Sequence, residues 1–246
     1  MTPKLLIFTT VNGRYRVYAD LFTFCCKRAY PEYRVEVKVL EESKIHYYAA
    51  CKRFLMNPEF DGDVYITDVD MMICPEKVSI QDFHREEIRK SGLFYSNSPR
   101  WKEPHGENRL TGLHYVTEDW WKKTYHEREM EAIELFYSKI GYCKCDDEMM
   151  LMRIVKNSGL PVAKYGPLIN RHHGIHLGTI RDYAGGTLQT KKTVLRQRID
   201  KERAWYWCNF IDTEDYRKLF KDIEKQDKQA TYELKELEKF VRMAWK

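Results

Sequence analysis

Hydrophobic positions in the first 70 residues alternate between strand-like and helix-like spacing. Unbroken or alternating apolar runs predict strands, and apolar residues three or four positions apart predict amphipathic helices. The predicted elements are a strand at 4–10, a helix ending before Pro31, a strand at 33–40, a helix at 43–55 capped by Ser43, and a strand at 63–67. Strands and helices that alternate in this way are typical of a mostly parallel α/β sheet flanked by helices.

Beyond residue 70 the spacing of hydrophobic residues is less regular, and it changes again near residue 194. We predict strands at 92–99 and 111–117 around a polar, loop-like stretch at 100–109, and helices at 118–140 and 146–159. From about residue 194, dense charges and regularly spaced aromatic and aliphatic residues predict two or three amphipathic helices. We therefore predict one α/β domain over 1–193 and a C-terminal helical extension over 194–246 packed on it. The aromatic residues of this extension are typical of helix packing; the alternative is contact with a membrane surface or a partner protein.

Composition narrows the class of protein only a little. The chain has 246 residues, 43% of them apolar and 32% charged, with a net charge of +5. A mild positive charge favours anionic ligands such as nucleotide phosphates, but without a clustered basic and aromatic motif we expect no nucleic-acid partner. The seven cysteines are odd in number, and the first apolar run is too short for a secretion signal. We therefore expect reduced thiols and a cytoplasmic protein.

Two acids interrupt the apolar run VYITDVDMMI at 64–73. Asp68 and Asp70 follow the third predicted strand, at the edge where open α/β sheets bind ligands. In an extended segment both side chains point the same way, and burying two neighbouring carboxylates is costly unless a positive group compensates them. Carboxylate oxygens suit Mn²⁺ or Mg²⁺, which also take phosphate oxygens. The pattern predicts a divalent cation at Asp68 and Asp70; the alternative is a polar strand end closing a turn.

Two further clusters are candidates for chemistry. Asp146, Asp147 and Glu148 begin a predicted helix, where acids favour the helix dipole even without a catalytic role. His172, His173 and His176 lie on one predicted loop, as does Arg181, which could meet a phosphate. A solvated polar loop is the alternative interpretation of the histidines, and His176 is the best candidate for a metal ligand.

The segment VYITDVDMMI resembles the D-x-D segment of GT-A-type glycosyltransferases, and shorter motifs over about residues 4–180 follow in the same order. The resemblance implies a GT-A-like fold in which Asp68 and Asp70 hold the metal that bridges a donor diphosphate, with Asp68 also near the ribose. It further implies that FTTVN (8–12) embraces the nucleotide base, that Arg53 faces the nucleotide, that the acid-led helix carries the acceptor-side carboxylate, and that His176 completes the metal site. The residues so assigned to the nucleotide are Thr9, Thr10, Val11, Asn12, Arg53 and Asp68.

These features together predict a metal-dependent glycosyltransferase. The sugar would pass from a nucleoside-diphosphate sugar to a glycan hydroxyl, with inversion slightly favoured. We assign Asp147 as general base, Asp146 as helix cap or acceptor-positioning group, and Glu148 as the fallback base. One alternative is a haloacid-dehalogenase-like phosphatase. Two features disfavour it: that family has a small residue where this chain has Met72, and it usually carries its acids on the first strand, which has none here. Another is a non-catalytic basic binding module.

Overall fold

The computed structural model describes residues 5–43, 47–97, 99–102, 107–137, 146–162, 173–178 and 201–245. The chain divides into two compact units that are not consecutive in sequence. The first comprises Met1–Gly13, Glu32–Asp68 and Lys77–Arg171, and the second comprises Arg14–Pro31, Val69–Glu76 and His172–Lys246. The C-terminal helices thus share a unit with two earlier segments, while the predicted division at residue 194 stays a prediction.

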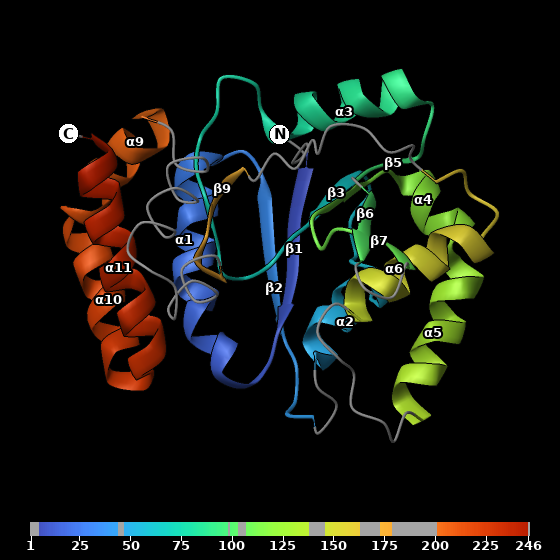
Figure 1. Ribbon diagram of the computed structural model, residues 1–246, viewed down its shortest axis with the longest axis horizontal. Helices are drawn as coiled ribbons and strands as arrows, with labels where there is room; N and C mark the ends of the chain where they lie inside the picture. Colours follow the sequence, from blue (N-terminus) through green and yellow to red (C-terminus); the bar gives the residue numbers. More distant parts are fainter. Residues whose placement is uncertain are drawn as a thin grey trace. The chain divides into compact units, whose positions relative to one another are not determined.

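A five-stranded mixed sheet forms the centre of the first unit (Figure 1). Its order is β2-β1-β3-β8-β5; β1 pairs in parallel with β2 and β3, and β8 is antiparallel to β3 and β5. Four strands therefore run in one direction, which confirms the predicted α/β class. The strands are β1 (Leu5–Val11), β2 (Arg34–Val39), β3 (Asp63–Ile66), β5 (Tyr95–Ser96) and β8 (His114–Val116).

Helices of the first unit pack on this sheet and on one another. Helix α2 (Tyr48–Leu55) contacts β1, α5 (Tyr125–Tyr137) and α6 (Asp146–Asn157), and their apolar faces share one core with β1, β3 and β8. The remaining helices are α3 (Ile80–Ser91), capped by the Ser79 hydroxyl, and α4 (Glu118–Lys123). All seven side chains of β1 are buried, because the strand lies inside the sheet and is covered by α2.

Two local predictions in this unit are wrong. The polar stretch at 100–109 belongs to an antiparallel pair, β6 (Pro99–Lys102) and β7 (Glu107–Leu110), held by backbone pairing and by the packing of β7 on α6. It lacks the apolar alternation by which a strand is recognised, so its pairing depends on tertiary context. Helix α2 starts at Tyr48 without a side-chain cap from Ser43, because Tyr47 adopts a left-handed conformation (φ 59°) immediately before it.

The second unit combines helices with a two-stranded sheet. A short 3-10 helix, η1 (Gly13–Tyr18), leads into α1 (Ala19–Ala29), and β4 (Met71–Ile73) pairs antiparallel with β9 (Gly174–His176). The expected C-terminal helices are α9 (Lys201–Ile211), α10 (Glu214–Gln226) and α11 (Lys228–Trp245), which pack together and on α1 (Figure 1). Within the ranges that the structure describes, no helix is long and apolar enough to cross a membrane.

Candidate functional site

The carboxyl ends of β1 and β3 and the start of β8 lie at one edge of the first unit. In the parallel pair of β1 and β3, Phe8 lies opposite Ile66, so Thr9 to Asn12 continue beside Thr67 and Asp68. In the antiparallel pair of β3 and β8, Ile66 lies opposite His114, so the residues before β8 also lie beside Asp68. The topology therefore gathers three chain segments at this edge, as expected where an α/β sheet binds a ligand.

Arg53 is the positive partner of Asp68 at this edge. Arg53 is 3% exposed, and its guanidinium donates from Nη1 to Asp68 Oδ1 and from Nη2 to Asp147 Oδ2, the latter at 2.9 Å. Burial by itself would lower the pKa of Arg53, but the two carboxylates outweigh it and raise the pKa above its ordinary value. One arginine and two aspartates leave the cluster, which we call the Arg53 cluster, with one excess negative charge.

The predicted acid cluster on α6 takes part in this arrangement. Asp147 is 7% exposed, and burial raises its pKa while Arg53 opposes the shift. Its neighbour Glu148 pairs with Arg109 Nη1 at 3.0 Å and accepts the Gly112 N–H at 3.2 Å. The Asp146 side chain lies outside the described residues. The two acids that can be placed thus each hold a basic side chain at this edge.

Gly112 is required by the close approach of Arg53. A Cβ atom at this position would lie 2.6 Å from Arg53 Nη2 and 3.7 Å from Asp68 Oδ2. From the sequence, the segment RLTGLHY (109–115) is a candidate lining of the sugar or acceptor pocket in which Gly112 allows close approach, with an ordinary turn as the alternative. Close approach at Gly112 is what the structure shows, but the partner is Arg53. The pairing of Arg109 with Glu148 carried no signal in the sequence, because Arg109 ends a stretch interpreted as a loop.

The expected base-binding segment lies at the end of β1. Thr9, Thr10 and Val11 are buried and Asn12 is half-buried. The Thr10 hydroxyl donates to the backbone oxygen of Ala49 on α2, whereas the buried Thr9 hydroxyl has no hydrogen-bond partner among the described residues. Their place at the ligand-binding edge of the sheet agrees with the prediction; their contact with a nucleotide stays a prediction.

In the second unit, Asp70 contacts His176. The pairing of β4 with β9 sets Met71 opposite His176, and the Leu177 N–H donates to the Asp70 backbone oxygen at 2.9 Å. His176 Nε2 then lies 3.1 Å from Asp70 Oδ1, and Asp70 is 4% exposed. A histidine more than a hundred positions away is thereby brought to the second acid of the D-x-D segment.

Two glycines make this contact sterically feasible. A Cβ atom at Gly174 would lie 2.0 Å from the backbone oxygen of Met72, so a side chain there would prevent the close pairing of β9 with β4. A Cβ atom at Gly178 would lie 2.8 Å from the His176 ring and 3.5 Å from Asp70 Oδ2.

These contacts correct part of the argument for a metal. Each acid has a basic partner in its own unit, Arg53 for Asp68 and His176 for Asp70, so burial alone does not require a cation. The segment is also not extended throughout, because the chain turns at Val69 and Asp70 between β3 and β4. The expectation that residues 68–70 form one extended segment is therefore wrong.

The other residues of the predicted loop are only partly placed. Arg181 and His172 lie outside the described residues. His173 is fully buried, and its Nδ1 lies 3.2 Å from Oε2 of Glu76, which also pairs with Arg203. Burial by itself would raise the pKa of Glu76, but these two partners lower it below its ordinary value. His173 thus belongs to a buried network within the second unit.

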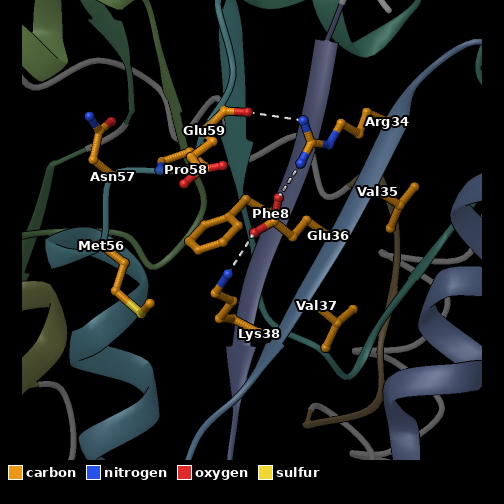
Figure 2. A pocket seen from close by; sticks show the side chains of 10 residues that line it. All are labelled: Phe8, Arg34, Val35, Glu36, Val37, Lys38, Met56, Asn57, Pro58 and Glu59. Carbon is orange, nitrogen blue, oxygen red and sulfur yellow. Dashed lines mark hydrogen bonds and ion pairs between the residues drawn. The ribbon is translucent and has the colours of Figure 1, made fainter.

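A cavity of about 480 Å³ lies elsewhere in the first unit, beside edge strand β2 (Figure 2). Its charged side chains satisfy one another: Arg34 donates to Glu36 and to the Glu59 backbone oxygen, both at 2.9 Å, and Lys38 lies 3.5 Å from Glu36 (Figure 2). The Arg53 cluster does not line this cavity.

Comparison with known proteins gives no relative from which a role could be transferred. No protein-family model, curated protein or solved structure matches the chain. Its function is therefore argued from the site itself.

Proposed function

We propose that this protein is a metal-dependent glycosyltransferase that uses a nucleoside-diphosphate sugar and a glycan acceptor, with a GT-A-like first unit. The observation that carries the proposal is the contact of His176 with Asp70 at 3.1 Å. It joins a late histidine to the D-x-D segment at the end of β3, which is the combination that the resemblance to GT-A enzymes requires.

Asp68, Asp70 and His176 are the proposed ligands of Mn²⁺ or Mg²⁺. Each offers one ligand atom of a kind that such a cation accepts. Asp68 is separated from Asp70 by a single residue, so the covalent chain keeps the two carboxylates near each other. The excess negative charge of the Arg53 cluster also favours a cation. When bound, the ion would offset the charge that develops on the leaving diphosphate.

The donor and the acceptor would then be held by different residues. Thr9 to Asn12 and Arg53 would contact the nucleotide, and Arg181, on the predicted phosphate-binding loop, would contact the diphosphate. Asp147 would accept the proton of the acceptor hydroxyl, with Asp146 positioning the acceptor and Glu148 as the fallback base. The raised pKa of Asp147 favours this role, because a base works best when its pKa approaches the working pH.

The proposal is tested by calorimetry with Mn²⁺ alone and with UDP, GDP, CDP and ADP, each with and without Mn²⁺. We expect one diphosphate to bind tightly only with the metal. Asp70→Asn should abolish this dependence, and His176→Ala should weaken binding far more with Mn²⁺ than without it. Asp61→Asn removes an exposed acid shortly before β3 and should leave the binding of metal and nucleotide unchanged. If the diphosphate binds equally well without Mn²⁺, or if the substitutions weaken its binding equally with and without Mn²⁺, then Asp68, Asp70 and His176 are not the metal ligands.

A further inference from the structure

A second cavity of about 800 Å³ opens at the other end of β3, away from Asp68. Its walls are the loop at 57–61, which leads into β3, together with α4 and the first turn of α5. Because Val64 lies opposite Val116 in the antiparallel pair, the start of β3 and the entry to α4 meet at this edge. The four residues of β3 put roughly 13 Å of strand between the cavity and the Arg53 cluster.

Three aromatic side chains line this cavity. Tyr125 is 60% exposed and presents its ring to solvent, while Phe60 is half-buried. The Phe60 ring lies close over Gly62, where a Cβ atom would come within 2.9 Å of it. Trp121 is buried and fixed from one side by the Arg128 guanidinium, 4.6 Å from the ring centroid. The cavity therefore has a rigid floor and two accessible aromatic rings.

Its polar groups do not suit an anion. Glu59, Asp61 and Glu118 outnumber Lys122 and Arg128 by one charge, and Lys122 is already paired with Glu118. Arg128 is 2% exposed, and its three hydrogen bonds go to backbone and hydroxyl oxygens.

Trp121 lines this cavity without offering its N–H to a ligand. The indole N–H has almost no accessible surface and no hydrogen-bond partner within the described part of the chain, so an oxygen in the cavity cannot reach it.

We propose that this cavity binds a neutral oligosaccharide. Aromatic rings beside a few carboxylates are what a sugar requires, because its C–H faces pack on rings and its hydroxyls bond to carboxylates. Tyr125 and Phe60 contact the sugar faces, and Asp61 accepts from hydroxyls. The inference does not rest on the proposed transferase activity, since the cavity shares no residue with the Arg53 cluster.

The test is titration of the full chain, without metal or nucleotide, with maltohexaose, cellohexaose and chitohexaose, followed by tryptophan fluorescence and calorimetry. We expect one of the three to bind and Tyr125→Ala to weaken it by roughly tenfold or more. Tyr137→Ala is the matched control, because Tyr137 is 73% exposed on the same helix but does not line the cavity. Asp70→Asn should leave saccharide binding unchanged.

Three results would overturn the inference: none of the three probes binds, the two tyrosine variants have equal effects, or Asp70→Asn loses saccharide binding. Binding of choline in place of the saccharides would show a site for a cation, and binding of UDP here that fades with salt would show a site for an anion. Both Tyr125 and Tyr137 are exposed, so neither substitution is expected to prevent folding.

Discussion

At the scale of single residues, the Arg53 cluster is where charge, burial and proposed chemistry coincide. Arg53 holds Asp68 and Asp147 together, and the pKa of Asp147 is raised because burial disfavours its charged form. The observed ion pair and the proposed catalytic base would therefore be two roles of one side chain. They can be separated by measuring stability and turnover in the same variant.

Asp147→Asn keeps the shape of the side chain and removes its charge. Turnover should fall by roughly 10² or more, the usual scale of a lost general base. The free energy of unfolding should fall by only about 1–3 kcal/mol, because Arg53 keeps Asp68 as a partner. The measurements are the transfer rate, the donor dissociation constant and urea unfolding. Near-normal turnover would move the base role to Glu148, and weakened donor binding would place Asp147 in the sugar pocket.

His114 gives a residue-level prediction for pH. It is fully buried on β8, its Nδ1 lies 2.9 Å from Asn97 Nδ2, and burial, aided by the Arg53 charge, lowers its pKa from 6.5 to about 3. In the unfolded chain His114 takes a proton below pH 6.5, whereas in the native chain it stays neutral down to about pH 3. Its contribution to stability is therefore lost as the pH falls through this window.

His114→Gln should flatten the pH dependence of unfolding. Between pH 6 and 4.5, the slope of the free energy of unfolding against pH should decrease by up to about 1.4 kcal/mol per pH unit, which is the effect of one proton. His126→Gln, at an exposed position on α5, should leave the slope unchanged. Urea unfolding at several pH values measures both, and equal slopes for His114→Gln and the unchanged protein would contradict the assignment.

At the scale of elements, Arg128 ties three helices of the first unit together. From α5 it donates to the backbone oxygen of Leu55 at the end of α2, to that of Trp121 on α4, and to the Thr124 hydroxyl. No carboxylate lies within ion-pair distance of it in the described ranges, and burial lowers its pKa to about 10. Its role in the fold is therefore to satisfy buried oxygens at helix ends.

Arg128→Met should lower the free energy of unfolding by about 2–4 kcal/mol, because buried carbonyl groups lose their donors. Arg89→Met is the control, since Arg89 is exposed and its ion pair in the described part of the chain is with Glu86 within α3; it should leave stability nearly unchanged. Urea unfolding at pH 7 compares the two. A similar small effect of both substitutions would show that water replaces the guanidinium.

At the scale of the whole molecule, the C-terminal helices belong to the core of the second unit. Trp207 on α9 donates to Cys74 Sγ at 2.8 Å, and the Tyr18 hydroxyl donates to Glu233 on α11 at 2.6 Å. The ring of Phe24 on α1 stacks on that of Phe210, with 5.5 Å between the ring centroids. These contacts join the end of the chain to residues 14–31 and 69–76. Removing the helices would expose the apolar face of α1.

A chain that ends at residue 193 should therefore lose hydrogen-exchange protection in α1. Ending the chain at residue 242 removes only the last four residues, of which Met243 is 49% exposed, and should leave that protection intact. Hydrogen exchange followed by mass spectrometry compares the two. Equal protection of α1 in both chains would show that the C-terminal helices are dispensable for this unit.

Sequence alone determined the α/β class, the first three strands, the C-terminal helices and the acids of the candidate site. Apolar periodicity and the position of an acid after a strand are local properties, so they can be seen in the order of the residues. The same reasoning was wrong for the hairpin of β6 and β7, whose polar sequence carries no local strand signal.

Only the tertiary structure decided which side chains meet. The antiparallel direction of β8 brings Gly112 to Arg53, the pairing of β7 helps to place Arg109 on Glu148, and the pairing of β9 with β4 brings His176 to Asp70. Strand direction and register depend on contacts between segments far apart in the chain. The basic partners of the two acids, Arg53 for the half-buried Asp68 and His176 for the buried Asp70, therefore emerge only when the chain is folded.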